Sequence, residues 1–247
     1  MKFGIGMEGK FVKYDYLTSF QRIDSKIATS DNSFLERDYI PSRTELTFSN
    51  GFYVKCTAMF VDIRDSSKLP NIHTRPKLAK LFRAFISEVI AVIIGNENCA
   101  EVNVEGDCII GIFNTPKKSQ IDSVFGTAYT ITSLIDVMNY KFKKYDISSI
   151  KIGIGLSWGR ALMIKAGFKG SGINDVVWMG DVLNEASMLS DYGNKTSSDK
   201  DIMVSRVFYG NLNDANKKLL RWNESRRCYH GNVGNTAMIA WYKKNCT

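Results

Sequence analysis

The chain has 247 residues, and its 33 Lys and Arg against 25 Asp and Glu give a formal net charge of +8 at pH 7. This length allows a hydrophobic core that needs no disulfides or structural metals. With 44% hydrophobic and 23% charged residues, the composition excludes a largely disordered chain, a collagen-like chain and a disulfide scaffold. The positive charge, which is concentrated in residues 205–247, predicts an anionic partner such as nucleic acid, a membrane surface or a phosphate compound.

The cysteines and the N-terminal sequence indicate a cytoplasmic protein. The five cysteines are odd in number and form no CxxC pair, and an isolated thiol in an apolar run behaves as a small hydrophobe. The N-terminus has no continuous apolar segment of the kind found in secretory signals. The most apolar run, residues 84–95, contains Glu88 and is too short to cross a bilayer. We therefore expect a soluble protein with reduced thiols.

We interpret residues 1–50 as an N-terminal extension and residues 51–247 as a single domain. The first half of this domain shows a strand, a helix, two strands joined by a hairpin turn at Glu105-Gly106-Asp107, and a second helix. The predicted segments are a strand over 53–61, a helix over 75–94, strands over 99–104 and 108–113, and a helix over 119–142.

The second half adds further strands and helices. The segments predicted there are strands over 150–156 and 161–166 around a turn at 157–160, a glycine-rich loop over 167–172, a strand over 176–179, a helix over 181–189, a strand over 202–205, a helix over 214–220 and a terminal hairpin that ends at 238–242. The order strand-helix-strand-strand-helix-strand predicts an α/β protein with a ferredoxin-like β-α-β-β-α-β core and C-terminal additions.

Two aspartates are expected to lie close together in this fold. The first strand of such a core is central and runs antiparallel to its hairpin neighbour, so its end lies beside the hairpin turn. Asp62 follows the first strand, and Asp107 lies in the turn. Neighbouring carboxylates repel each other unless a proton or a cation lies between them. The pair predicts a site for a hard divalent cation such as Mg²⁺, although either aspartate alone is more typical of a strand end or a turn.

The residues that follow Asp62 are typical of a phosphate-binding turn. The sequence Ile-Arg-Asp-Ser-Ser-Lys over 63–68 leads from the strand toward a helix. Backbone N–H groups at such a turn, with hydroxyls and a cation nearby, bind anions. This arrangement suits a triphosphate beside two metal ions. An ordinary helix cap at Ser66 is the alternative.

Four segments together resemble the catalytic domain of class III nucleotidyl cyclases, in the right order from about Tyr53 to Leu189. AMFVDIRDSS resembles the family's F-x-D-I-x-x-[ST]-[ST] metal and phosphate segment, and VNVEGDCIIGIF resembles its second metal segment around G-D. KIGIGLSWGRALM resembles the G-I-G-x-x-x-G strand pair, and VWMGDVLNEASML resembles the W-G-x-x-V-N-x-A-x-R-L helix. One of these matches alone is a weak signal, whereas four in register are specific.

The resemblance implies that a nucleoside triphosphate is converted to its 3′,5′-cyclic monophosphate and diphosphate by in-line attack of the 3′-hydroxyl. It implies two divalent ions per site, Mg²⁺ or Mn²⁺, held by Asp62, Asp107 and the Ile63 carbonyl. Asn184 matches the asparagine that orients the ribose, and the family's sites are shared between the two chains of a homodimer. The positions implied to bind substrate are Phe60, Ile63, Arg64, Asp65, Ser66, Ser67, Asn103, Val177 and Asn184.

One catalytic residue of the family is missing. Its transition-state arginine follows the asparagine by four residues, and Met188 occupies that position here. Losing a preorganised donor of this kind costs about 10²–10³ in rate. Either the enzyme is inactive or another cation has taken the role. The candidates are Arg64 and Arg160, ahead of Lys165, and each of the three is equally typical of a solvated surface charge.

A purine-recognising pair is also missing. Adenylate cyclases place a lysine where this chain has Asn103 and an aspartate where it has Val177, and guanine readers place a glutamate at the first position. Together with the segments DYIPSRT, FVDIRDSS and GINDVVWMGDVLNEAS, this pattern resembles the Pycsar pyrimidine cyclases of bacterial anti-phage defence. The implied substrate is UTP, with CTP as the alternative because an amide also faces cytosine by flipping. The cyclic product would then activate a partner effector.

Other functions fit the sequence less well. An RNA-recognition module has a similar sheet and would explain the positive charge, but a carboxylate pair repels a phosphate backbone. A diguanylate cyclase would need a GG-[DE]-[DE]-F turn, which the chain lacks. A catalytically silent cyclase homologue that senses nucleotides stays open because of Met188. We expect neither nucleic acid nor a membrane as a partner.

Overall fold

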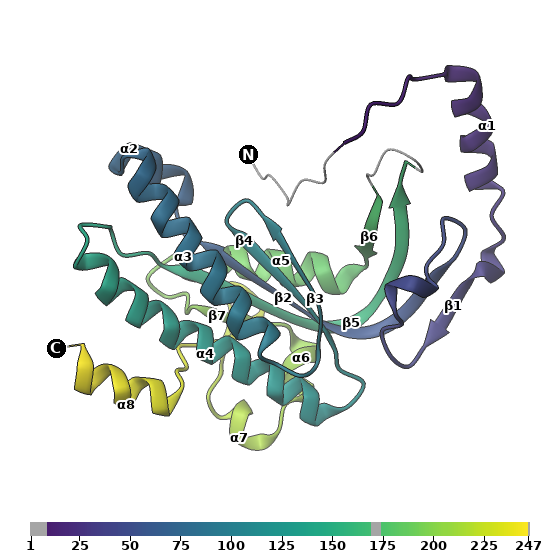
Figure 1. Cartoon of the computed structure of the whole chain (residues 1–247). Helices are drawn as coiled ribbons and strands as arrows, with labels where there is room; N and C mark the ends of the chain where they lie inside the picture. The colour runs from purple at the N-terminus through teal and green to yellow at the C-terminus, as the bar shows by residue number, and fades with distance from the viewer. Residues whose placement is uncertain (1–8, 169–173, 247) are drawn as a thin grey trace.

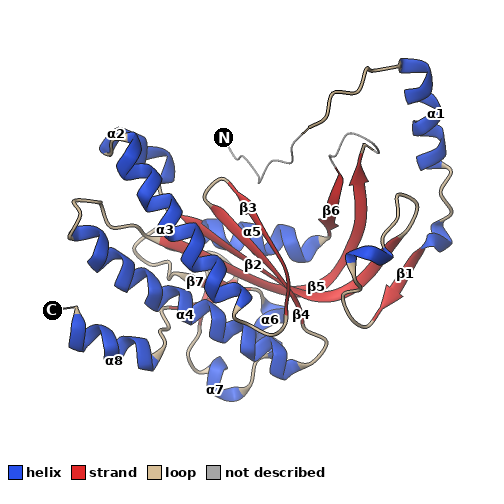
Figure 2. Cartoon of the chain, in the orientation of Figure 1, coloured by secondary structure: helices blue, strands red, loops and turns tan. Residues whose placement is uncertain are grey.

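The computed structural model describes residues 9–168 and 174–246, in which helices flank one nine-stranded sheet (Figures 1 and 2). The strands are β1 (Phe34–Arg37), β2 (Gly51–Ile63), β3 (Cys99–Glu105), β4 (Cys108–Asn114), β5 (Ile152–Gly167), β6 (Asn174–Met179), β7 (Ile202–Val204), β8 (Arg221–Asn223) and β9 (Cys228–Gly231). The helices are α1 (Tyr16–Ile27), α2 (Leu69–Ile72), α3 (Arg75–Ile94), α4 (Lys118–Lys143), α5 (Asp181–Tyr192), α6 (Arg206–Asn211), α7 (Asp214–Lys217) and α8 (Thr236–Asn245).

The predicted β-α-β-β-α-β core is confirmed. It consists of β2, α3, β3, β4, α4 and β5 in chain order, and its strands lie side by side as β3-β4-β2-β5. Strand β2 is central and runs antiparallel to both β4 and β5. Most of its residues are buried on both faces, which is why its sequence is almost continuously apolar and aromatic.

Helices α3 and α4 cover one face of the sheet (Figure 1). The buried residues of α3 are Leu81, Phe85, Val89 and Ile93, which recur every four residues and form one stripe. This stripe belongs to a single large apolar cluster that also contains residues of β2, β4 and α4. The core of the molecule therefore lies on this face.

Helix α5 packs on the opposite face of the sheet, in a second apolar cluster with β2, β4 and β5. Two glycines of β5 allow this close approach. A Cβ atom at Gly155 would lie 1.9 Å from the carbonyl oxygen of Ala186, and one at Gly153 would lie 2.1 Å from that of Ser190. Only glycine fits where backbone meets backbone at this distance. The G-I-G motif is thus the contact surface for α5.

The predicted N-terminal extension takes part in the sheet. Strand β1 pairs with β2 in parallel, so this segment is attached along the first residues of β2. A 3₁₀ helix, Arg43–Glu45, follows and is held by a capping box between Ser42 and Glu45. Helix α1, in contrast, buries none of its side chains and lies apart from the sheet in Figure 1.

Strand β5 is longer than predicted. The structure shows one continuous strand where the sequence suggested two strands and a turn at 157–160. Trp158 and Arg160 continue the ladder by pairing with Thr57 and Lys55 of β2, so the long partner strand overrides the turn preference of Ser-Trp-Gly-Arg. Of the predicted glycine-rich loop, residues 169–172 lie outside the described part of the chain.

The prediction for the C-terminal end was wrong in one element. The hairpin consists of β8 and β9, and residues 238–242 lie in α8. The side chain of Asn235 caps this helix by accepting hydrogen bonds from the backbone N–H groups of Ala237 and Met238. The apolar and aromatic residues at 238–242 suggested a strand, whereas the cap at Asn235 marks the start of a helix.

The cysteines behave as the sequence predicted. All five are free thiols, and four of them are buried. Burial raises the pKa of Cys56 to about 12, so this side chain stays a neutral, apolar thiol. Within the described residues, no helix combines the length and hydropathy that crossing a membrane requires.

Candidate active site

The two aspartates predicted to bind metal lie beside each other at one end of the sheet. Val61 pairs with Ile109, so the next step of the same register places Asp62 opposite Cys108. Asp107 directly precedes Cys108 in the hairpin turn. The topology therefore brings together two carboxylates that are far apart in the sequence.

One oxygen of this pair has no partner. The Oδ2 atom of Asp107 is buried and makes no hydrogen bond. A buried charge is costly unless it is paired or binds a metal. Carboxylate and backbone carbonyl oxygens are the ligands that hard divalent cations prefer, and Asp62, Asp107 and the Ile63 carbonyl supply this donor set. The residues present therefore fit Mg²⁺ or Mn²⁺, and the described part of the chain holds no cluster of three or more His, Cys, Asp or Glu that would compete for it.

A cavity of about 310 Å³ opens next to Asp62. Its wall on the β2 side is the predicted phosphate segment, and its other wall comes from the end of α5 and the loop that follows. Asp65 adopts a left-handed backbone with φ of 56°, which turns the chain out of β2 into a 3₁₀ helix. The lining residues are Asp62, Ile63, Arg64, Asp65, Ser66, Ser67, Asp191, Asn194 and Lys195.

Arg64 links the two walls of this cavity. Its Nη2 atom lies 3.0 Å from Oδ2 of Asp62, and its Nη1 atom donates to the backbone oxygen of Asp191 at 2.8 Å. The side chain is only 11% exposed, and its Nε atom is buried without a hydrogen-bond partner. Arg64 thus keeps a positive charge and an unused donor beside the carboxylates.

The residues predicted to face the base lie in a second cavity, of about 530 Å³, on the α5 face of the sheet. Asn103 of β3 and Val177 of β6 line it, together with Trp178 and Leu183. Phe60 lies under the same face, 8% exposed, in the apolar cluster with α5. Two residues here were not predicted: Arg43, from the N-terminal segment, lines the cavity, and Glu101, buried behind it, is hydrogen-bonded to Asn103.

A sequence profile of the adenylate and guanylate cyclase catalytic domain matches residues 50–238. The chain belongs to this family of nucleotidyl cyclases. It is 40% identical over 222 residues to a uridylate cyclase of Treponema porcinum, which covers 89% of this chain and 77% of that protein. It is 39% identical over 214 residues to a uridylate cyclase of Gulbenkiania mobilis, with 83% and 82% covered.

A solved structure shares the fold of this cyclase. A class III adenylyl cyclase-like ATP-binding protein from Pseudomonas aeruginosa superposes with a TM-score of 0.70 at 15% sequence identity, over 93% of this chain and 50% of that one. The predicted family and class III cyclase fold are confirmed, and the chain is an enzyme of the nucleotidyl cyclase type.

The positions predicted to orient the ribose and to match the family's transition-state arginine lie on α5. Asn184 is exposed, and Met188 is 46% exposed one turn later on the same side of the helix. An apolar thioether at this exposed position offers no charge to a phosphate. The structure therefore leaves the position of the family's arginine without a cation.

Arg160 and Lys165 lie away from the two aspartates. Ala161 belongs to the cluster under α5, so its neighbour Arg160 points to the opposite face of β5. There the guanidinium of Arg160 lies 3.6 Å over the ring of Tyr53 and forms an ion pair with Glu36. Of the three predicted cations, only Arg64 contacts an aspartate that is predicted to bind metal.

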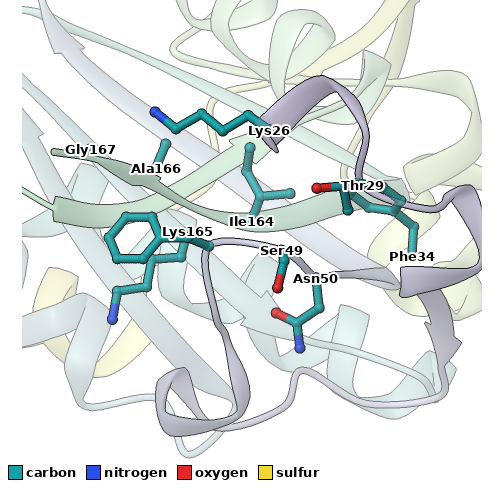
Figure 3. Close-up of a pocket in the computed structure, with 10 residues that line it drawn as sticks. Lys26, Thr29, Phe34, Ser49, Asn50, Ile164, Lys165, Ala166 and Gly167 are labelled. Carbon is teal, nitrogen blue, oxygen red and sulfur yellow. The ribbon is translucent and has the colours of Figure 1, made fainter. Parts of the chain in front are cut away.

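Lys165 lines a separate cavity of about 230 Å³ near the end of β5, between that strand, the end of α1 and the segment before β2 (Figure 3). It lies twelve residues further along β5 than Gly153, the residue that pairs with Asp62. In an extended strand this corresponds to roughly 40 Å. Lys165 therefore cannot act on a substrate bound at Asp62 of its own chain.

The two cavities of the predicted site are separate within one chain. The carboxylate cavity and the base cavity share no lining residue. The first lies at Asp191, near the end of α5, and the second at Leu183, near its start. At about 1.5 Å per residue, these positions are roughly 12 Å apart along the helix.

Proposed function

We propose that this cyclase converts UTP into 3′,5′-cyclic UMP and diphosphate. The observation that supports the chemistry is the Asp62–Asp107 pair, in which a buried carboxylate oxygen lacks a hydrogen-bond partner. The observation that favours UTP is the identity of about 40% to two relatives named uridylate cyclase. CTP is the alternative substrate.

The reaction requires positioning and charge stabilisation more than covalent chemistry. The ribose 3′-oxygen forms a bond to the α-phosphorus while the bond from that phosphorus to the bridging oxygen breaks. Diphosphate leaves with the electron pair, and the hydroxyl proton passes to solvent. Asp62, Asp107 and the Ile63 carbonyl would hold two divalent ions, which would neutralise the phosphate charge.

The other residues bind and orient the substrate. Backbone N–H groups of residues 63–67 hold the β- and γ-phosphates at the turn after β2. Asn184 orients the ribose, and Asn103 and Val177 face the base. Arg64 takes the role of the missing arginine, because its charge already lies beside Asp62.

The active enzyme is a homodimer in this proposal. The separation of the two cavities along α5 supports it, since a single triphosphate bound to the carboxylates of one chain can meet Asn184 and Asn103 of a second chain. A twofold-symmetric pair of chains then contains two equivalent shared sites. The product acts in the cytoplasm as a second messenger for a separate effector in anti-phage defence. Cells with such an effector should survive phage challenge with the intact cyclase and not with Asp107→Asn.

The deciding experiment incubates the purified protein with Mn²⁺ or Mg²⁺ and each of the four ribonucleoside triphosphates separately. We expect cyclic product from UTP, no turnover in Asp107→Asn, and wild-type turnover in Glu97→Gln, an exposed acidic residue just before β3 that lines neither cavity. Arg64→Ala should lower kcat by about 10²-fold or more, whereas Arg160→Ala should change it by no more than about two-fold. Equal turnover of UTP and purine triphosphates would contradict the assignment.

The second candidate function is a catalytically silent nucleotide sensor. Met188 on the exposed side of α5 favours it, because the cyclase lacks the family's cation at this position. No cyclic product from any triphosphate, together with saturable triphosphate binding, would establish this function instead.

A further inference from the structure

At the base cavity, three side chains from two distant segments are linked by an ion pair and a hydrogen bond; Arg43 and Asn103 line the cavity, and Glu101 joins them. Glu101 on β3 has a side chain that is only 4% exposed. Its Oε2 atom forms an ion pair with Nη2 of Arg43 at 3.0 Å, and its Oε1 atom accepts a hydrogen bond from Nδ2 of Asn103 at 2.8 Å. Glu101 and Asn103 project to the same face of β3, because side chains two residues apart in a strand do so.

The carboxylate of Glu101 determines how Asn103 is oriented. An ionised carboxylate only accepts hydrogen bonds, so the amide nitrogen of Asn103 must face it and the amide oxygen must face away. Without such a neighbour an asparagine can present either group. With Glu101 in place, the Oδ1 atom of Asn103 is the group that remains for a ligand in the cavity.

Arg43 adds donors to the same cavity. The capping box of Ser42 and Glu45 fixes the 3₁₀ helix that begins at Arg43, and the guanidinium also pairs with Asp175 of β6 at 3.3 Å. The side chain is 55% exposed, and a guanidinium has five N–H donors, of which these contacts use two. The wall also holds the indole N–H of Trp178, which is buried without a hydrogen-bond partner.

We propose that Arg43 and Asn103 together recognise the pyrimidine edge, and that Glu101 is the positioning residue that holds Asn103 with its oxygen toward the base. Uracil presents one N–H donor between two carbonyl acceptors, so it needs one acceptor and neighbouring donors from the protein. Asn103 supplies the acceptor for the central N3–H of uracil, and Arg43 supplies a donor for a flanking carbonyl; cytosine has an acceptor at N3, which the Asn103 oxygen opposes. Guanine presents two adjacent donors on this edge, and its second N–H would face the N–H donors of Arg43, which cannot accept a hydrogen bond. This inference rests on the proposed function, because it concerns the base of the same substrate.

The experiment measures binding, so that it does not depend on turnover. Dissociation constants are measured by calorimetry, with Mg²⁺, for 3′-deoxy-UTP, 3′-deoxy-CTP and inorganic tripolyphosphate. The deoxy analogues lack the attacking hydroxyl and cannot cyclise, and tripolyphosphate has no base. In Glu101→Gln, the new glutamine amide can both donate and accept hydrogen bonds, so the side-chain amide of Asn103 is free to flip. We expect the preference for the uracil analogue over the cytosine analogue to fall at least about tenfold. The flipped Asn103 amide can then present its N–H group to the N3 acceptor of cytosine.

Two further variants separate base recognition from a general loss of structure. Arg43→Gln should weaken both deoxynucleotides by about tenfold or more and leave tripolyphosphate unchanged. Glu97→Gln makes the same charge change at an exposed position just before β3 and should change none of the three constants.

Two outcomes would overturn the proposal. One is an unchanged uracil-to-cytosine preference in Glu101→Gln. The other is a loss of tripolyphosphate affinity as large as the loss of nucleotide affinity. A wild-type protein that binds these ligands as expected yet forms no cyclic product would contradict the proposed function alone.

Discussion

Asp107 has a buried oxygen without a hydrogen-bond partner because the hairpin that holds it closes beside the end of β2. A second unpartnered carboxylate oxygen, Oδ1 of Asp201 just before β7, has a different character. Asp201 does not line the cavity beside Asp62. Burial raises its pKa, and the charge of another acid, Asp136, acts on it and raises its pKa further. At the scale of single residues, the two buried acids therefore differ: Asp107 lies beside a predicted cation site, whereas Asp201 only lowers the stability of the fold.

Asp201 makes stability depend on pH. Burial, with a smaller effect from the charge of Asp136, raises the pKa of Asp201 from 3.8 to about 6. Because the folded state disfavours the charged form, stability falls as pH rises from about 4 to about 6 and stays lower above that range. We therefore expect Asp201→Asn to stabilise the protein at pH 7.5, by about 2–3 kcal/mol at most, and to have little effect near pH 4.

Thermal unfolding of Asp201→Asn at pH 4 and pH 7.5 tests this expectation. The matched control is Asp38→Asn, which makes the same substitution at an exposed position. An equal change in melting temperature at both pH values would show that the effect does not come from the titration of Asp201.

At the scale of secondary-structure elements, the seam between β5 and α5 decides where the substrate residues lie. Gly153 and Gly155 allow the helix backbone to pack against the strand. The same helix carries Asn184 near the base cavity and, one residue before its end, Asp191 beside Arg64. Moving α5 outward would therefore shift both cavities relative to the carboxylates.

Gly155→Ala should destabilise the protein and impair the site. The new Cβ atom would lie 1.9 Å from the Ala186 carbonyl oxygen and 2.3 Å from the Ser190 nitrogen, so the helix must move. We expect a loss of about 1–3 kcal/mol or more in the free energy of unfolding, measured by urea denaturation.

Gly159→Ala is the control in the same strand. Its Cβ atom would meet Val182 at 3.4 Å, an ordinary contact distance, so we expect a change within about 0.5 kcal/mol. Similar losses in both variants would mean that strand propensity, and not the contact with α5, explains the glycines.

At the scale of the whole molecule, the proposed shared sites predict that inactive variants complement each other. Asp107→Asn lacks the metal half of the site, and Asn184→Ala lacks the ribose half. A mixed dimer contains one site with both defects and one site with none. After random exchange of subunits, half of the dimers are mixed, so we expect about a quarter of wild-type activity.

The measurement is turnover of UTP after the two variants are mixed, incubated to allow exchange and compared with each variant alone. A mixture of Asp107→Asn with a second metal variant, Asp62→Asn, is the negative control because both defects lie in the same half. Activity that stays at the level of the separate variants, in a protein that sedimentation shows to be dimeric, would contradict shared sites.

The local sequence already determined much of this protein. The four-residue stripe of α3, the apolar run of β2 and the hairpin around Gly106 gave the core elements and their order. Because the topology of such a core places the first strand beside the hairpin, the proximity of Asp62 and Asp107 followed from sequence and was confirmed by the register. The same reasoning failed at 157–160 and 238–242, where strand pairing and a helix cap outweighed local residue preferences.

The net positive charge of the chain says little about the proposed substrate site of the folded molecule. The basic residues near the C-terminus lie on α6 to α8 and the β8–β9 hairpin, and none of them lines the carboxylate cavity or the base cavity. Arg226, for example, is paired with Asp199: burial raises the pKa of that aspartate, but hydrogen bonds from Arg226, Thr196 and Asn223 outweigh it and lower the pKa to about 2.

Only the tertiary structure decided which cations and amides face the base and phosphate cavities. Arg43 lies in the segment DYIPSRT, whose sequence does not indicate that this arginine would pair with Glu101, 58 residues later. Arg160 lies inside a cyclase motif and yet points to the opposite face, because side-chain direction in a strand alternates with register. Sequence patterns determine elements through local periodicity, whereas contacts between distant segments depend on register, twist and close packing, which no local pattern encodes.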